Sequence, residues 1–487
     1  MSVEGVTVAL SLISHTNAGK TTLARTLLAR DVGEVRDAPH VTTAATAYTL
    51  IETEHGDRLA LWDTPGFGDS ARLARRLGQQ GNPIGWFLSQ VWDRWRDRPF
   101  WLTQLAVRHV RDDADVVLYL VNAAEDPADA GYLAPELAVL AWIGKPVLVL
   151  LNQTGPPRPP ADEAADVARW QAALAAYPHV RGVLALDAFA RCWVQELALF
   201  AAIAPLVSAG HIVAFTRLAD AWRAKRWREF DDAMTALAQP LAAAACARVV
   251  VPRTPMLRKL GAAIGIGTDE ADAGARRAFE QMAQATDRDL VDAMAKLIAI
   301  HGLAGRAAGE VEARMAGDIA REGPIGEGKA AAMGGVVSGA LTGLAADLAA
   351  GGLTFGAGML TGALVGALGG AGVARAWNVV RGRSEDVVRW GDAFLERLAV
   401  TSLLRYLAVA HYGRGRGDYR DGEYPPFWRP RVESAVAARR GAFVEAWAGR
   451  EPGCDAAAVA AALAPLLRAT ARAVLAELYP AALAAGA

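Results

Sequence analysis

The chain has little cysteine, and its three cysteines are widely separated. Cys192, Cys246 and Cys454 are odd in number and lack the spacing of a metal-ligand motif. Scattered cysteines of this kind are typical of a reducing compartment, where thiols stay reduced. We therefore expect three unpaired thiols and a cytoplasmic protein.

The chain also has no excess of charge of either sign. Lys and Arg number 51 and Asp and Glu number 52, so the formal net charge is -1. A protein that binds nucleic acid usually carries an excess of basic residues, so we expect no nucleic-acid partner. The segment MSVEGVTVAL carries Glu4 where a secretion signal would be basic, so we expect it to belong to the fold.

What the chain does contain divides it into two different halves. Up to residue 205, short apolar runs alternate with helical stretches, which predicts a mostly parallel sheet flanked by helices. After residue 205 the Ala-rich, helically periodic sequence predicts an all-α remainder, with a loop over Gly413–Pro430. The expected strands are Val6–Ile13, Ala47–Glu52, Arg58–Trp62, Asp115–Val121, Pro146–Leu151 and Gly182–Leu186. The expected segments are 1–205 (α/β), 206–329 (helical), 330–374 (a glycine-rich apolar hairpin) and 375–487 (helical).

The first expected strand runs directly into SHTNAGKTTL, which begins at Ser14. Gly19, Lys20 and Thr21 match the phosphate-binding pattern GxxxxGK[ST], with Ser14 in place of the first glycine. A turn from strand into helix directs backbone N–H groups and the helix's partial positive charge at one point, which favours a polyphosphate. We expect Lys20 to reach the β and γ phosphates and the Thr21 hydroxyl to bind Mg²⁺. The predicted phosphate-binding residues are Ser14, His15, Asn17, Ala18, Gly19, Lys20, Thr21, Thr22 and Gly66, although His15 is equally interpretable as a residue packed beside the loop.

A second motif, DTPG, follows the strand-like sequence LALW. Its Asp63 is placed to hold Mg²⁺ through water, and the N–H of Gly66 to sense the γ-phosphate. Between the two motifs, Thr42 or Thr43 is a candidate switch threonine; the predicted metal-binding residues are Thr21, Thr43 and Asp63. Phe67 occupies the position where Ras-like enzymes have the glutamine that orients water. We therefore expect slow hydrolysis that depends on a loop residue, a second molecule or a partner protein.

The base-recognition motif departs from the usual guanine-specific sequence NKxD. The chain has NQTG from Asn152 to Gly155, so a glycine replaces the carboxylate that pairs with guanine. Losing such a pair costs on the order of 1.5 to 3 kcal/mol per charge-assisted bond, which weakens guanine selectivity. Asp187, at the end of a later strand, either replaces that carboxylate or caps its own strand. The predicted base-binding residues are Asn152, Gln153 and Asp187.

With these motifs, the chain resembles bacterial GTPases of the translation-factor-related class whose GTPase domain precedes a helical domain of unknown function, DUF3482. The resemblance covers most of the chain and includes SHTNAGKTTL, DTPGF, LDAFARCW from Leu186 to Trp193, and RYLAVAHYGRGRG from Arg405 to Gly417. It implies a Ras-like P-loop domain that binds GTP or GDP with Mg²⁺ through Lys20, Thr21 and Asp63. We expect either a slow GTPase switch that forms GDP and phosphate, or a non-catalytic nucleotide-dependent scaffold.

The segment from Ala330 to Ala374 has a single charged residue, Asp347. Two runs of about twenty apolar residues, Ala331–Ala350 and Leu353–Gly372, are each long enough to cross a bilayer as a helix. Glycine at every fourth position allows close helix packing in lipid. The expected partners are therefore membrane lipid or a membrane protein, at the cytoplasmic face of the inner membrane. In the soluble alternative, the hairpin packs inside the helical domain or forms a homo-oligomer.

Two tryptophan-containing stretches also leave alternatives open. The stretch after Phe67 carries four tryptophans and either senses the nucleotide state or docks on the helical domain. The basic residues of 217–228, with Trp222 and Trp227, either lie on anionic lipid or form a solvated helix face whose tryptophans turn to the core.

Overall fold

A computed structural model describes most of the chain and divides it into two compact units. The first unit contains Met1–Arg228, Ala410–Asp418 and Leu475–Ala487, and the second contains Glu229–Val409 and Tyr419–Val474. The described residues are 5–15, 18–29, 46–64, 66–67, 70–78, 107, 110–155, 157–188, 192–252, 269–303, 377–381, 385–412, 425–450 and 453–485.

The first unit is built on a six-stranded sheet with the order β2-β3-β1-β4-β5-β6. Only β2 is antiparallel to its neighbour, and the other neighbouring strands run parallel. The strands are β1 (Thr7–Ser14), β2 (Thr46–Glu52), β3 (Arg58–Asp63), β4 (Val116–Asn122), β5 (Val147–Asn152) and β6 (Val180–Ala185). All six predicted strands are present, with ends that differ by at most two residues. The predicted α/β class is thus confirmed.

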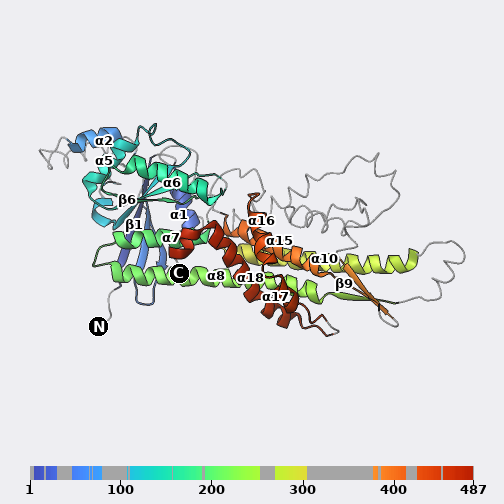
Figure 1. The fold of residues 1–487 in the computed structure, drawn as a ribbon. Helices are drawn as coiled ribbons and strands as arrows, with labels where there is room; N and C mark the ends of the chain where they lie inside the picture. The colour runs from blue at the N-terminus through green and yellow to red at the C-terminus, as the bar shows by residue number, and fades with distance from the viewer. Residues whose placement is uncertain are drawn as a thin grey trace. The chain divides into compact units, whose positions relative to one another are not determined.

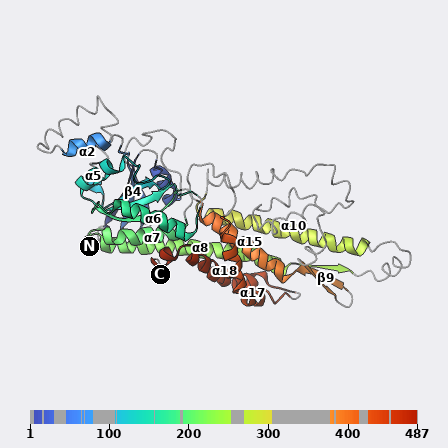
Figure 2. The same cartoon turned by 45° about the horizontal axis from the view of Figure 1, so that its top comes forward.

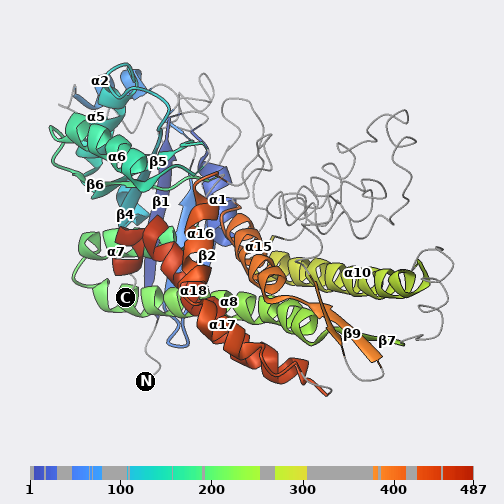
Figure 3. The same ribbon diagram turned by 45° about the vertical axis from the view of Figure 1, so that its right-hand side comes forward.

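Helices cover both faces of this sheet. Successive strand residues point to opposite faces, and both alternating sets, such as Ile13 and Leu12 on β1, are fully buried. Side chains of α2 (Ser70–Gly78), α5 (Leu133–Ile143) and α6 (Pro160–Leu174) share one apolar core with the β1, β4 and β5 side chains of one face. Figures 1 and 3 show α5 and α6 on the same side of the sheet. The first unit also contains α1 (Lys20–Leu28), α7 (Trp193–Ile203), the short 3-10 helix η1 (Ala204–Leu206) and the C-terminal α19 (Pro480–Ala485).

The long helix α8 (Ile212–Cys246) begins in the first unit and ends in the second. Its first half is joined to α7 by a buried ion pair: Glu196 accepts hydrogen bonds from Arg226 Nε and Nη2 at 2.7 and 3.0 Å and from Trp222 Nε1 at 2.7 Å. Trp227 makes an edge contact with Trp193 at 5.0 Å. Arg226 and Trp222 are 6% and 1% exposed, so they belong to the core and not to a lipid-facing surface.

The second unit is mostly helical, but the prediction of an all-α remainder is wrong at one place. Strands β7 (Arg248–Pro252), β9 (Glu385–Trp390) and β8 (Trp377–Arg381) form a three-stranded antiparallel sheet in that order. Figure 3 shows β7 and β9 next to each other. β7 and β9 are valine-rich but only five and six residues long, and 132 residues separate them in the sequence. Such short strands are difficult to distinguish from helical segments before their partner is known.

The helices of the second unit pack side by side. They are the second half of α8, α10 (Asp269–Ile300), α15 (Asp392–Ala410), α16 (Trp428–Ala437), α17 (Arg440–Ala446) and most of α18 (Ala456–Leu478). Tyr406 of α15 lies between Phe230 of α8 and His301 after α10, with ring centroids 5.8 and 5.7 Å apart. Figure 2 shows α10 and α15 next to each other. Because α16 begins at Trp428, the predicted loop over 413–430 is wrong at its last residues.

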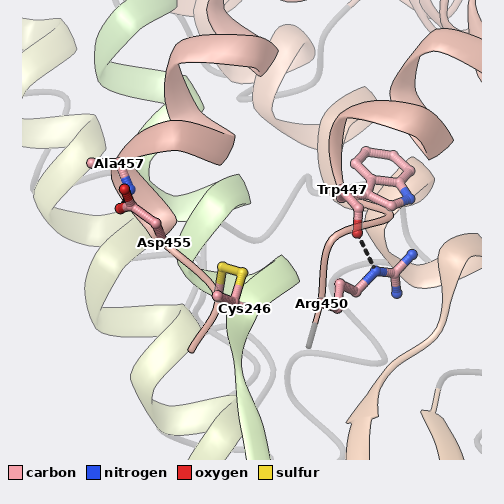
Figure 4. The surroundings of a disulfide bond; sticks show 6 residues. Cys246, Trp447, Arg450, Asp455 and Ala457 are labelled. Carbon is pink, nitrogen blue, oxygen red and sulfur yellow. Dashed lines mark hydrogen bonds between the residues drawn. A yellow bond between two sulfur atoms is a disulfide. The ribbon is translucent and has the colours of Figure 1, made fainter. Parts of the chain in front are cut away.

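The second unit contains a disulfide that joins Cys246, at the end of α8, to Cys454, just before α18 (Figure 4). Asp455 accepts a hydrogen bond from the backbone N–H of Ala457 at 2.9 Å, and nearby Arg450 Nε donates to the carbonyl of Trp447 at 2.7 Å. Our expectation of three unpaired thiols is therefore wrong for two of them. The pairing was not readable from the sequence, because 208 residues separate the two cysteines.

One described helix, Ala456–Leu478, is long and apolar enough to cross a bilayer, but 44% of its apolar window is buried inside the protein. A core helix passes the same test, so this is weak evidence for a membrane span. The predicted hairpin of 330–374 and the tryptophan-rich stretch of 79–106 lie outside the described residues.

Candidate phosphate and magnesium site

The predicted phosphate loop joins the end of β1 to the start of α1, at the carboxyl edge of the parallel strands. This edge is where ligands bind in open α/β sheets. Gly19, immediately before α1, has φ of 90°, a left-handed conformation that favours glycine. A Cβ atom at Gly19 would lie 2.5 Å from Nδ2 of Asn152, so both backbone conformation and space require glycine here.

Lys20 is held at the start of α1 by the serine that replaces the first glycine of the pattern. Its Nζ donates a hydrogen bond to Ser14 Oγ at 3.0 Å, and both residues are buried. Burial lowers the pKa of Lys20, and the negative charges of Asp63 and Glu136 oppose that shift. The ammonium group is therefore poised in a low-dielectric site, where its attraction to a phosphate is stronger than in water.

Thr21 and Asp63 meet as the sequence predicted for a Mg²⁺ site. The Thr21 hydroxyl donates to Asp63 Oδ2 at 2.5 Å, although 42 residues separate the two. Asp63 is 2% exposed, and among the described residues its Oδ1 atom has no hydrogen-bond partner. Burial raises the pKa of Asp63, while the Thr21 hydrogen bond and the charge of Lys20 lower it. A hard cation that takes oxygen ligands fits this hydroxyl and carboxylate pair and would give the buried Oδ1 a partner.

The turn after β3 fixes the position of Asp63 and turns Phe67 away from solvent. The Thr64 hydroxyl donates to the carbonyl of Leu12 at 2.6 Å, which ties the turn to β1. Phe67 is fully buried in the core with Ile13 and Leu73. Its ring is therefore part of the core and has no polar atom with which to orient water.

Asn152 connects three parts of the site. Its Nδ2 donates to the carbonyl of Ala18 at 2.7 Å, and its Oδ1 accepts from the N–H of Ala188 at 2.8 Å. Asn152 is fully buried, so both bonds are made away from water. The NQTG turn thereby holds the phosphate loop on one side and the turn after β6 on the other.

Asp187 lies beside the NQTG turn. Its Oδ2 atom accepts hydrogen bonds from the backbone N–H and the hydroxyl of Thr154 at 2.5 and 2.9 Å. The structure thus brings Asp187 against Thr154, the residue before Gly155, where NKxD has its carboxylate. Its contact with guanine stays a prediction, as does that of Gln153, which adopts a left-handed φ of 59°.

The first prediction concerns this carboxylate. We expect Asp187→Ala to lower the affinity for GTP by about tenfold and the affinity for ATP much less, because guanine offers two adjacent N–H donors, at N1 and N2, to a carboxylate, whereas N1 of adenine is an acceptor. Competition of GTP and ATP against a fluorescent nucleotide measures both. Asp166→Asn is the matched control, since Asp166 pairs with Arg158 and Arg169 on the protein. An unchanged ratio of GTP to ATP affinity in Asp187→Ala would assign Asp187 a bracing role only.

The sequence did not point to Glu136, which lies beside His15 of the phosphate loop. Glu136, in the first turn of α5, is fully buried and contacts His15 Nδ1 at 2.8 Å and the hydroxyl of Tyr119 at 2.7 Å. The His15 side chain is thus bonded to the protein, and its predicted contact with phosphate stays a prediction. The available signal was that Glu136 is the only charged residue of α5, LAPELAVLAWI.

Some predicted residues lie outside the described part of the chain. These are Asn17 in the phosphate loop and Thr42 and Thr43 in the candidate switch. Ala18, Thr22 and Gly66 are described and border the site, and their contacts with nucleotide stay predictions. Within the described ranges, no cluster of three or more His, Cys, Asp or Glu residues could hold a metal ion.

Comparison with known families agrees with this geometry. Residues 9–153 match the family described as 50S ribosome-binding GTPase. Residues 172–441 match the family described as domain of unknown function DUF3482, a match of more than half of the 487 residues. The chain belongs to the DUF3482 family. Its N-terminal part is accordingly a GTP-binding P-loop GTPase domain, and most of the DUF3482 match falls on the mostly helical part that follows.

Solved structures of Era resemble part of this DUF3482 protein. An Era variant from Aquifex aeolicus bound to GDP·AlF4⁻ is 16% identical with a TM-score of 0.31, over 42% of this chain and 57% of that one. Era in complex with MgGDPNP and a segment of 16S ribosomal RNA is 16% identical with a TM-score of 0.28, over 38% and 52%. The chain thus covers little more than half of each Era chain. No curated protein matches it. The RNA belongs to the Era complex, and the expected lack of a nucleic-acid partner here stays a prediction.

Proposed function

We propose that this DUF3482 protein is a Mg²⁺-dependent GTP switch that hydrolyses GTP slowly to GDP and phosphate. The observation that carries the proposal is the group of Lys20, Thr21 and Asp63: beside the Thr21 hydroxyl, the buried carboxylate of Asp63 has one oxygen without a hydrogen-bond partner among the described residues. When bound, Mg²⁺ supplies positive charge to the β and γ phosphate oxygens. Lys20 supplies a second positive charge, and the N-terminus of α1 supplies backbone N–H groups.

Slow turnover follows from the position of Phe67. Ras-like GTPases accelerate hydrolysis by orienting a water molecule with a glutamine directly after the DxxG motif. Here that side chain is a phenyl ring buried in the core. The groups that orient water must then come from another segment or from a partner. A protein without such a partner would act as the non-catalytic scaffold of our alternative interpretation.

A path for signalling the nucleotide state starts at β3. This strand ends in Asp63 at the site, and Asp57 precedes it at the opposite end. Asp57 is 1% exposed and accepts hydrogen bonds from the N–H of Val6 at 3.1 Å and from Nε of Arg217 at 2.6 Å. The bond to Arg217 lowers the pKa of Asp57, so the carboxylate stays charged. Since Arg217 belongs to α8, a shift of β3 would act directly on the helix that continues into the second unit.

The second prediction tests the enzymatic part of the proposal. Phosphate release from GTP by the full chain should be measurable but slow in Mg²⁺ and should fall to the background rate in EDTA. Thr21→Ala should lower the rate at least tenfold at saturating GTP, because it removes a metal ligand. Thr26→Ser is the matched control: Thr26 lies on the same helix, and its hydroxyl bonds the carbonyls of Thr22 and Ala188. Tight GTP binding with no phosphate release would support the scaffold instead.

Membrane association is also part of the proposal, and it is supported by the sequence of 330–374 alone. The two apolar runs and their glycine spacing favour insertion at the cytoplasmic face of the inner membrane, with an oligomer contact as the alternative.

A further inference from the structure

We propose that Glu136 is a positioning residue of the phosphate loop and acts on the bound nucleotide through His15. The inference deepens the proposed function, on which it rests. Glu136 belongs to α5 and His15 to the loop, and 121 residues separate them. The contact is the point at which a helix of the core holds the first residue after β1.

The hydrogen bonds define which of Tyr119, Glu136 and His15 donates and which accepts. Tyr119 lies on β4 and is fully buried, and burial together with Glu136 raises its pKa well above the usual value. Its hydroxyl therefore keeps its proton and donates to Glu136 Oε2 at 2.7 Å. A carboxylate only accepts, so Oε1 accepts from Nδ1–H of His15 at 2.8 Å. Both oxygens of Glu136 are thus satisfied, one by the sheet and one by the phosphate loop.

The His15 ring is held on its face as well as on its edge. It stacks on the Tyr132 ring, with centroids 4.2 Å apart and an interplanar angle of 12°. Tyr132 directly precedes α5, and its hydroxyl donates to Glu125 Oε2 at 3.0 Å. Two contacts from the start of the same helix thus fix the plane and the direction of a ring that is 38% exposed.

His15 is also connected to Lys20, the lysine of the phosphate loop, through its backbone carbonyl and Ser14. His15 follows Ser14, whose hydroxyl donates to the His15 carbonyl and accepts from Lys20 Nζ. A change of the His15 backbone, which the anchored ring opposes, would change the direction of this carbonyl and with it the position of the Ser14 hydroxyl. Glu136 therefore positions the Ser14 hydroxyl and the Lys20 ammonium, which face the proposed phosphate site, and does not itself contact the phosphates.

The cost of burying Glu136 supports a role beyond packing. A buried carboxylate is costly to desolvate, and an apolar residue of similar volume would pack at least as well beside the buried Leu133, Leu137 and Leu140. The start of a helix reduces this cost, because the helix dipole favours negative charge there. The hydrogen bonds from Tyr119 and His15 reduce the desolvation cost further. Of the two, only the bond from His15 connects Glu136 to the phosphate loop.

The test is a double-mutant cycle on nucleotide dissociation in the full chain. The measured quantity is the rate at which a fluorescent GDP analogue leaves the protein in excess unlabelled GDP and Mg²⁺. We expect Glu136→Leu and His15→Ala each to accelerate dissociation about tenfold, as for the loss of one charge-assisted hydrogen bond. The double variant should be no faster than either single variant, because both changes break the same connection.

Conservative variants separate positioning from packing. Glu136→Gln keeps an acceptor oxygen for His15, so its GDP dissociation rate should stay within about threefold of the wild-type rate. Tyr119→Phe removes only the bond to the sheet and should change the dissociation rate less than His15→Ala does. Both variants keep the shape of the core, so they serve if Glu136→Leu fails to fold. Rates that multiply in the double variant, or a His15→Ala rate equal to that of the wild type, would overturn the proposal. A wild-type chain that binds no guanine nucleotide would instead overturn the proposed function itself.

Discussion

Lys20→Ala is expected to lower the affinity for GTP on the order of 100-fold, because it removes the ammonium that we propose contacts two phosphates, in a site where charge interactions are strong. Lys20 is buried, and burial lowers its pKa, so its removal also relieves a desolvation cost. The variant should therefore be at least as resistant to thermal unfolding as the wild type. Titration with a fluorescent GTP analogue measures the affinity, and circular dichroism follows unfolding.

Lys145→Ala is the control for this variant. Lys145 lies two residues before β5, at the amino end of the strands and so away from the edge that carries the phosphate loop. It should bind GTP like the wild type. Equal GTP affinity of Lys20→Ala and Lys145→Ala would contradict the assignment of Lys20.

The second large effect is expected at the ion pair between α7 and α8. Arg226→Met should lower the free energy of unfolding of the first unit by about 3 to 5 kcal/mol, because it leaves the carboxylate of Glu196 buried without a counter-charge. Glu196 is fully buried, and Arg226 donates to both of its oxygens. The measurement is urea denaturation of the full chain, followed by the fluorescence of the tryptophans of this unit.

A neighbouring arginine provides the matched control for that effect. Arg223 pairs with Asp220 at the surface, with 41% of its side chain exposed, and Arg223→Met should cost about 0 to 1 kcal/mol. Adding Glu196→Leu to Arg226→Met should recover most of the lost stability, because an apolar pair replaces the buried ions. If Arg226→Met were no less stable than Arg223→Met, the ion pair of Glu196 and Arg226 would not be what holds α8 against α7.

The sequence predicted the parts of the fold that depend on local pattern. Strands β1, β3, β4 and β5 of the first sheet are largely buried apolar runs, and apolar runs bounded by turns are readable without knowledge of their partners. The meeting of Thr21 and Asp63 was also predictable, because both motifs end parallel strands whose carboxyl ends share one edge. Apart from the start of α16 inside a predicted loop, the remaining errors involve partners that are far apart in the chain.

Glu136, the small sheet and the disulfide illustrate this limit. The sequence shows a lone glutamate in an apolar helix, but not that it lies beside His15, 121 residues earlier. It shows the valine-rich stretch at 248–252, but not that it pairs with residues 385–390. Cys246 and Cys454 are likewise brought together by the packing of α8 against the segment before α18. Each of these contacts depends on tertiary structure, for which a single sequence carries no spacing rule.

The most direct test of the central claim is calorimetric titration of the full chain with GTP, in Mg²⁺ and then in EDTA, for the wild type and for Asp63→Asn. Asp63 is the buried carboxylate with an unsatisfied oxygen, so its charge should be what makes Mg²⁺ strengthen GTP binding. The account predicts tight binding of GTP by the wild type in Mg²⁺, weaker binding in EDTA, and little difference between the two conditions for Asp63→Asn. Equal GTP affinity of the wild type in Mg²⁺ and in EDTA would contradict it.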